Sequence, residues 1–207
     1  MTQGFEFTVR KRPTQVRAQA TFDALVESCA RLLPELGYEG LTTNAVAERA
    51  GVGIGSLYEY FPGKDAIIAL VVEQLVERVL TRLGRELDTI LDTRPDDAVE
   101  RWIARVHDIM QTERALISVL MQQVPYTRQL ASLRNLPATL LAFSERARLA
   151  AGIHMQRPAA SLLLINNLVS TTIMQLVLDP PGGISQAELI GALSAHVNEL
   201  LLASGSR

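Results

Sequence analysis

The heptapeptide IGSLYEY, which begins at Ile54, combines small side chains, hydroxyl groups and an apolar residue at its tip. Gly55 and Ser56 allow a backbone to approach another surface closely, and the hydroxyls of Tyr58 and Tyr60 can hydrogen-bond phosphate oxygens. Ile54 is suited to contact the methyl group of thymine in the major groove. We therefore expect a short helix here that binds duplex DNA.

A second short helix and a tight turn precede this heptapeptide and would position it. Thr42 or Thr43 is expected to cap a helix from Asn44 to about Ala50, because a threonine hydroxyl accepts hydrogen bonds from the first free amides of a helix. Gly51 suits the turn that follows, since glycine adopts positive φ without steric cost. Two short helices joined by such a turn form a helix-turn-helix.

Longer helices are predicted on both sides of the helix-turn-helix. Thr14 is expected to cap the first of them, whose apolar residues recur every three or four positions until Gly37 ends it. After a Phe-Pro-Gly stop at residues 61–63, a long helix is expected to begin at Lys64 or Asp65 and to continue to a break at residues 92–95. Lys64 adds a positive charge close to the heptapeptide.

The composition and periodicity of the whole chain predict an all-α protein. Its 207 residues are 48% hydrophobic and 20% charged, which is typical of a globular chain with a substantial core. About nine helices are expected, the last opened by a capping box at residues 185–188. We expect two domains: residues 1–63, an N-terminal arm with the three-helix DNA-binding domain, and residues 64–207, a helical effector-binding and dimerisation domain.

Bulk charge does not indicate a nucleic-acid-binding protein, because the net charge is −2. Affinity for DNA must therefore come from a local group of positive side chains. Such a group occurs in the N-terminal arm at Arg10, Lys11 and Arg12, although a basic tail of this kind also serves solubility. The single cysteine, Cys29, excludes an internal disulfide framework, fits a reducing compartment and is expected in the core.

One segment, residues 161–178, is nearly apolar enough to be considered a membrane span. It carries several amide and hydroxyl side chains and ends at an Asp-Pro pair, so we expect a buried helix rather than a membrane segment. The N-terminus lacks the apolar core of a signal peptide. A cytoplasmic protein without a membrane partner is the resulting expectation.

Several short elements of the first third of the chain occur in a characteristic order: Thr42-Thr43, Ala47-Glu48-Arg49-Ala50-Gly51-Val52, Gly55-Ser56-Leu57-Tyr58, Tyr60-Phe61 and Lys64-Asp65. Together they resemble the DNA-binding domain of the TetR family of bacterial transcriptional regulators. The remainder of the chain is similar to the family only in its helical architecture. The resemblance implies a ligand-responsive repressor that a small molecule releases from a palindromic operator.

The resemblance also implies roles for individual positions. Thr43, beside Thr42, would contact a phosphate, and Asn44 would reach base edges. Four residues of the third helix would face the groove: Ile54, Gly55, Ser56 and Tyr58. Tyr60 and Lys64 would contact the DNA backbone. Gly53 stands where the family usually has a serine cap, at a cost of roughly a few tenths of a kcal/mol. Ala45 replaces a longer polar residue, so a contact there is lost.

The family architecture implies a homodimer formed by the last two helices, residues 157–178 and 185–203. The sequence supports this independently, because the first of these helices is apolar on most sides and the second carries an apolar stripe. A two-fold dimer also matches a palindromic operator. The candidate dimer contacts are Leu164, Leu168, Ile190, Leu193, Val197 and Leu200.

The family further implies a cavity for an apolar or amphipathic effector among the middle helices. Methionines and aromatic residues with sparse polar groups make adaptable apolar pockets. The candidates are Trp102, His107, Met110, Met121, Tyr126, Phe143, Asn167 and Met174. Ordinary core packing explains each of them at least as well, and His107 beside Asp108 also fits a pair on a helix surface.

A function of another class, a di-iron helical enzyme, requires Glu-x-x-His units on facing helices. None of His107, His154 and His196 has a glutamate three residues before it. The sequence also contains no Cys-His metal cluster, phosphate-binding glycine loop or nucleophile elbow. We therefore expect no enzyme activity, metal or cofactor. The remaining alternative is a helical ligand-binding protein without DNA binding, which the intact helix-turn-helix disfavours.

Overall fold

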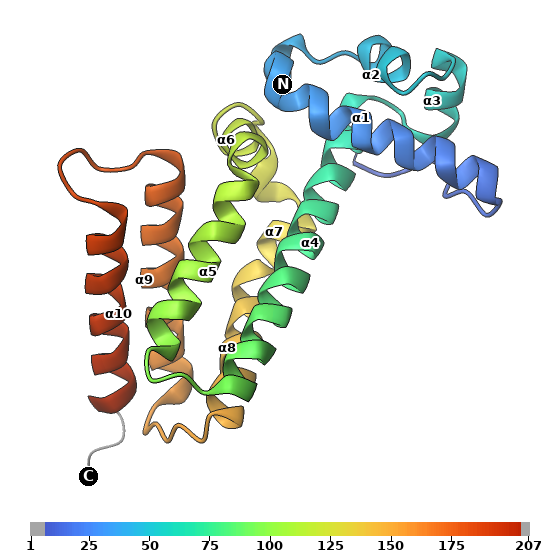
Figure 1. Cartoon of the computed structure of the whole chain (residues 1–207). Coiled ribbons are helices and arrows are strands. Elements are labelled where there is room, and N and C mark those ends of the chain that lie inside the picture. The colour runs from blue at the N-terminus through green and yellow to red at the C-terminus, as the bar shows by residue number, and fades with distance from the viewer. Residues whose placement is uncertain (1–6, 204–207) are drawn as a thin grey trace. The chain divides into compact units, whose positions relative to one another are not determined.

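The computed structural model describes residues 7–203, which form ten α-helices and one short 3-10 helix (Figure 1). The helices are α1 (Val16–Gly40), α2 (Thr43–Arg49), α3 (Ile54–Tyr60), α4 (Lys64–Thr93), α5 (Ala98–Thr112), α6 (Arg114–Gln122), η1 (Thr127–Gln129), α7 (Ala131–Arg134), α8 (Leu136–Ala150), α9 (Pro158–Leu178) and α10 (Gln186–Ala203). The described residues include no strand, so the predicted all-α class is confirmed. Nine α-helices have seven or more residues, and α7 is a single turn that the sequence did not indicate.

The chain packs into two units. The first comprises residues up to Glu77 together with Ala115–Arg134, and the second comprises Arg78–Arg114 together with the residues from Asn135 onward. The long helix α4 therefore contributes its first half to one unit and its second half to the other. The predicted domain boundary after residue 63 stays a prediction, whereas packing groups the start of α4 and residues 115–134 with the helix-turn-helix.

In the first unit, α2 and α3 both pack against α1. Val46 of α2 and Leu57 of α3 are fully buried with Leu25 and Cys29 of α1, which confirms the predicted core position of the cysteine. Burial raises the pKa of the Cys29 thiol to about 12. The hydroxyl of Thr42 accepts a hydrogen bond from the Ala45 amide at 3.1 Å, so Thr42 is the cap of α2.

Both ends of α1 differ from the predicted ones. The helix begins at Val16 after Gln15, which makes no side-chain capping bond, so the predicted cap at Thr14 is wrong. At the other end Gly37 leaves the helical region with φ of 71°, and the chain then completes one further turn to Gly40. The predicted glycine break is therefore present, although the helix does not stop there.

In the second unit, α5, α9 and α10 pack against one another and α8 packs on α9. Their shared core contains eight buried apolar residues: Ile103, Ile165, Ile173, Leu176, Val177, Ile190, Leu193 and Val197. Ser185 accepts a hydrogen bond from the Glu188 amide at 3.1 Å, which confirms the predicted cap of α10. By length and composition alone α9 could cross a membrane, a test that core helices of soluble proteins also pass.

We predict that Gly37→Ala destabilises the protein by about 1–3 kcal/mol. Alanine at this position would have to adopt a positive φ, which is strained for a residue with a Cβ. Its Cβ would also lie 2.6 Å from Oε1 of Gln123. The measurement is the free energy of unfolding from chemical denaturation. Gly84→Ala is the matched control, because that glycine lies within α4 and a Cβ there meets nothing within 4 Å. It should leave stability unchanged or raise it by up to about 1 kcal/mol; equal losses in both variants would contradict the prediction.

Candidate nucleic-acid interface

Helix α3 turns one face into the core of the first unit and the other toward solvent. Leu57 is fully buried, while Ile54 and Tyr58 are 38% and 43% exposed. Gly55 is exposed, and a Cβ placed on it would meet nothing within 4 Å. Ser56 is half-buried beside it. The outer face of α3 therefore carries little bulk around two exposed side chains, as a helix that enters a groove requires.

Two of the predicted phosphate-binding hydroxyls lie together. Oγ1 of Thr43, the first residue of α2, and the hydroxyl of Tyr58 are 3.1 Å apart, and either one can be the donor. The pair joins the start of α2 to the outer face of α3, and a hydroxyl retains acceptor and donor capacity after making one bond. Asn44 is exposed next to Thr43. Helices α2 and α3 thus present a common polar edge.

Tyr60 and Phe61 pack inward at the end of α3. Tyr60 is 7% exposed, with its ring edge-on to Phe22 at 5.5 Å, and Phe61 stacks on Phe22 at 4.9 Å. Such contacts hold α3 against α1. The Tyr60 ring is thus mainly a packing group, and its predicted contact with the DNA backbone stays a prediction.

Lys64 is tied into the fold at the start of α4. Its ammonium donates a hydrogen bond to the carbonyl of Tyr38 at 2.7 Å and lies 4.2 Å from the centroid of the Tyr38 ring. A lysine engaged in this way stabilises the junction of α1 with α4. Any contact between Lys64 and a phosphate would use its remaining two N–H donors.

The three basic residues of the arm, which looked equivalent in sequence, are placed differently. The backbone amide of Arg10 donates to the carbonyl of Tyr60 at 2.8 Å, and Nη1 of Arg10 donates to the carbonyl of Tyr58 at 3.1 Å. Lys11 and Arg12 are exposed and show no side-chain bond to the rest of the described chain. The arm therefore offers two uncommitted positive charges beside α3.

A polar junction that the sequence did not reveal centres on Asp65, the second residue of α4. Its Oδ1 accepts hydrogen bonds from the hydroxyls of Tyr38 at 3.0 Å and of Tyr126 at 2.8 Å. Oε1 of Gln123 accepts the backbone amide of Tyr38 at 3.0 Å. Residues 123–126 are thereby bound to the end of α1 and the start of α4. The partners lie up to 85 residues apart, so no local pattern indicated them.

Both tyrosines of this junction stay protonated well above neutral pH. Burial raises the pKa of Tyr38 to about 12, and the carboxylate of Asp65, which accepts a hydrogen bond from its hydroxyl, adds to the effect. The same two causes raise the pKa of Tyr126. The two hydroxyls therefore remain donors to Asp65 under ordinary conditions.

The predicted effector-binding residues do not form one group. Tyr126 is fully buried, and it belongs to the first unit together with Met121, which is exposed. The others lie in the second unit, where the Trp102 and Phe143 rings stack at 5.7 Å. Met110 is half-buried against the core of the second unit, and Met174 is half-buried on α9. Asn167 lies on the exposed side of α9.

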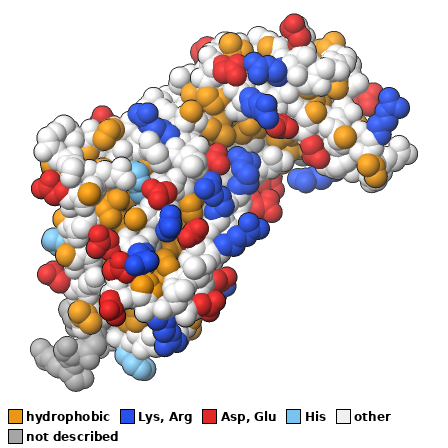
Figure 2. Space-filling view, in the orientation of Figure 1, with side chains coloured by type: hydrophobic (Ala, Val, Ile, Leu, Met, Phe, Trp, Pro, Cys, Tyr) orange, Lys and Arg blue, Asp and Glu red, His pale blue; other side chains and the backbone are white. Residues whose placement is uncertain are grey.

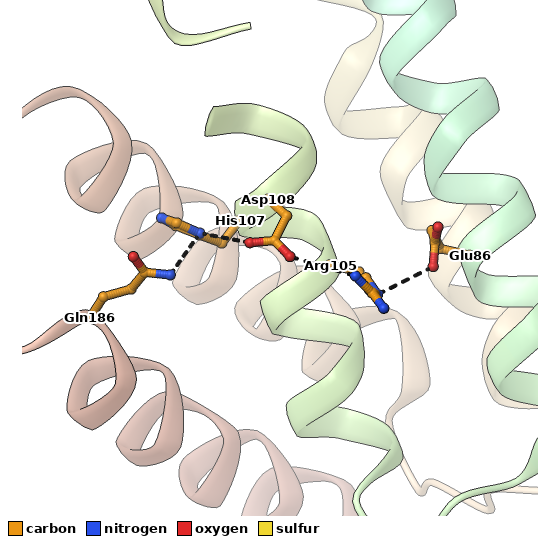
Figure 3. A network of polar contacts seen from close by, with 5 residues as sticks. All are labelled: Glu86, Arg105, His107, Asp108 and Gln186. Carbon is orange, nitrogen blue, oxygen red and sulfur yellow. Dashed lines mark hydrogen bonds and ion pairs between the residues drawn. The ribbon is translucent and has the colours of Figure 1, made fainter. Parts of the chain in front are cut away.

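His107 belongs to a polar network that crosses the second unit (Figure 3). Nδ1 of His107 lies 3.0 Å from Nε2 of Gln186 and 3.5 Å from Oδ1 of Asp108. Arg105 continues the network from Asp108 to Glu86 at 3.7 and 3.5 Å. The predicted pairing of His107 with Asp108 is therefore present, but His107 is buried rather than on the helix surface.

The predicted dimer contacts fall into two classes. Leu164 and Leu168 are exposed on α9. By contrast, the apolar stripe of α10 is covered within the chain: Ile190, Leu193 and Val197 are buried. Leu200, the last residue of the stripe, is half-buried. This stripe holds α10 against α5 and α9, so it leaves almost no surface for a partner. The large apolar side chains of these two helices that are exposed are Leu163, Leu164 and Leu168, with Leu202 at the end of α10.

The surface in view in Figure 2 carries Lys and Arg interspersed with Asp and Glu, without a field of one sign. This agrees with the net charge of −2. Among the described residues, no three His, Cys, Asp or Glu side chains are grouped so that they could hold a metal ion.

Residues 25–71 match the model of the bacterial regulatory proteins of the tetR family. These residues include α2, α3, their turn and the start of α4, which are the elements of the interface described above. Over these residues the chain is similar to the DNA-binding domain of the TetR family. Its relatives include nucleoid occlusion factor SlmA of Haemophilus influenzae, 29% identical over 104 residues, and the HTH-type transcriptional regulator UidR of Escherichia coli, 22% identical over 129 residues. These matches cover 50% and 62% of this chain and 42% and 65% of the relatives' own lengths.

Solved TetR-type structures share the fold over most of this chain. A transcriptional regulator from Rhodococcus sp. RHA1 aligns with a TM-score of 0.65 at 20% identity, covering 89% of this chain and 98% of the other. A TetR-family regulator from Streptomyces coelicolor aligns with a TM-score of 0.54 at 21% identity, covering 89% and 99%. At this level of identity the similarity shows that the second unit shares the fold of these structures. It does not assign roles to individual residues there.

We predict that Tyr126→Phe destabilises the protein by about 1–2 kcal/mol, because Asp65 loses one of its two tyrosine donors while the ring is kept. Thermal and chemical unfolding measure the change. Tyr58→Phe is the matched control, since it removes an exposed hydroxyl and should stay within about 0.5 kcal/mol of the parent. A Tyr126→Phe protein as stable as the control would show that the Asp65 junction contributes little.

Proposed function

We propose that this chain is a sequence-specific DNA-binding transcriptional regulator. The observation that carries the proposal is the outer face of α3, where Ile54, Gly55 and Ser56 leave room for a groove and Tyr58 pairs with Thr43. Phosphate contacts position such a helix and base-edge contacts give it specificity. We assign the hydroxyl pair and the arm residues Lys11 and Arg12 to phosphates, and Asn44, Ile54 and Ser56 to bases.

The regulator acts as a homodimer on a palindromic operator. Exposed leucines on α9 support a partner at that helix, because large apolar side chains gathered on one helix favour association. In a two-fold dimer the two α3 helices enter successive major grooves, roughly 34 Å apart. We place the contact on Leu164 and Leu168 rather than on the buried stripe of α10.

A small apolar or amphipathic molecule releases the operator in this proposal. In the second unit the candidate contacts for such a molecule are Trp102, which stacks on Phe143, together with Met110 and the buried His107. Release requires only that the effector binds more tightly to the dimer whose α3 spacing does not fit DNA. Repression in the cytoplasm is the simplest regulatory outcome of such a switch.

Selection from a random duplex library tests the proposed function directly. The full chain should enrich a palindromic site with two similar half-sites. Retention of DNA without any enriched sequence, or no retention at low salt, would reject the proposal. A non-DNA-binding ligand carrier, the alternative function, would give the second result.

Two substitutions on α3 should separate base contacts from phosphate contacts. Ile54→Ala should change the order of preference among operator variants, because each altered base contact is worth about 1–3 kcal/mol. Tyr58→Phe should weaken all duplexes by a similar factor and leave that order unchanged. Binding titrations against a panel of single-base operator variants measure both. An unchanged order for Ile54→Ala would remove that residue from the base-reading set.

We predict that Leu164→Glu converts the dimer to a monomer at micromolar concentration, since a carboxylate in an apolar contact is desolvated without a partner. Sedimentation velocity measures the mass. Leu149→Glu is the matched control, because Leu149 of α8 is 63% exposed and Leu164 is 61% exposed. A dimer that survives Leu164→Glu would place the interface elsewhere.

A further inference from the structure

The C-terminal end of α3 is held by a single residue of the N-terminal arm. Arg10 supplies two donors to it: its backbone amide to the carbonyl of Tyr60 at 2.8 Å and its guanidinium to the carbonyl of Tyr58 at 3.1 Å. The amide of Phe61 occupies the carbonyl of Leu57 at 2.9 Å. Three of the last four carbonyls of α3 therefore have donors, and Arg10 provides two of them.

Helix α3 is short enough to need this support. It has seven residues, and helices of this length are marginal without external contacts. Its N-cap, Gly53, makes no side-chain hydrogen bond. The four terminal carbonyls of a helix lack partners within it, and a positive charge near them interacts favourably with the helix dipole. Arg10 meets both needs at the end where α3 has no basic residue of its own.

The guanidinium of Arg10 also contacts Tyr58, the residue whose hydroxyl connects α3 to α2. The backbone carbonyl of Tyr58 accepts from Arg10, and its side-chain hydroxyl pairs with Thr43. Tyr58 is thus held at its backbone from the arm and at its hydroxyl from α2. Loss of the first contact frees the backbone that carries the second.

We propose that Arg10 is a positioning residue, which fixes the end of α3 and its exposed face, rather than a residue that contacts DNA. Lys11 and Arg12, next to it in the chain, are the arm residues left for phosphates. The consequence for DNA binding rests on the proposed function, whereas the effect on α3 is a property of the free protein. The two are tested separately.

The first test is hydrogen–deuterium exchange of the free full-length protein, followed on peptides that cover residues 54–61. Arg10→Ala should raise exchange there by roughly fivefold, the factor expected for one charged hydrogen bond and a helix-dipole contact at an exposed site. The matched controls, Lys11→Ala and Arg12→Ala, should leave it unchanged. Equal exchange in all three variants and the parent would overturn the proposal, whatever the protein does with DNA.

The second test is the salt dependence of operator binding. Removing a phosphate contact lowers the slope of log K against log salt by about 0.9, as expected for Lys11→Ala. Arg10→Ala should instead weaken operator binding by roughly fivefold with an unchanged slope. Arg10→Gln, which keeps an uncharged donor, should recover part of this loss. A slope lowered as in Lys11→Ala, or no recovery in Arg10→Gln, would mark Arg10 as a phosphate contact and overturn the proposal.

Discussion

The hydrogen bonds received by Asp65 join three segments of the first unit that are distant in sequence. The end of α1, the start of α4 and the residues after α6 meet at Oδ1 of this carboxylate. A half-buried carboxylate is tolerated there because two tyrosine hydroxyls and the adjacent helix start satisfy it. The position of α3 depends on this junction indirectly, since α3 rests on α1 through Phe22, Tyr60 and Phe61.

Helix α3 is thus a short element whose position and orientation are set by the residues that surround it. Leu57 anchors its inner face, the aromatic contacts set its distance from α1, and Arg10 holds its end. Functional sites are more accurate when such supports lock the residues that touch the ligand. The outer face can then consist of small and adaptable residues without losing its orientation.

The sequence was sufficient for the features that depend on local pattern. Helical periodicity, the Thr42 and Ser185 caps, the turn at Gly51 and the bounds of α3 all follow from residues within a few positions of one another. What it did not reveal depends on tertiary pairing. Arg10 differs from Lys11 only through carbonyls some 50 residues away, and Tyr126 was assigned to an effector site because nothing near it in sequence points to Asp65.

The α10 stripe illustrates a second limit of pattern. A row of apolar residues predicts that a face is covered, but it does not specify whether by the same chain or by another copy. Ile190, Leu193 and Val197 are covered by α5 and α9, so of the predicted dimer contacts the proposal keeps the exposed Leu164 and Leu168 of α9. Burial within the monomer decides such cases, and only the folded chain supplies it.

Because of the Asp65 junction, the first unit, which carries α2 and α3, is built from two separate segments of the sequence. Tyr126 and Gln123 are encoded well downstream of α3, yet they complete the same packed unit as α1 and α4. A chimaera that joins residues up to 77 of this chain to the C-terminal helices of another regulator would lack both partners. Exchange of DNA specificity between such proteins would therefore require two segments to be transferred together, or the recipient to provide a tyrosine and a glutamine at the matching places.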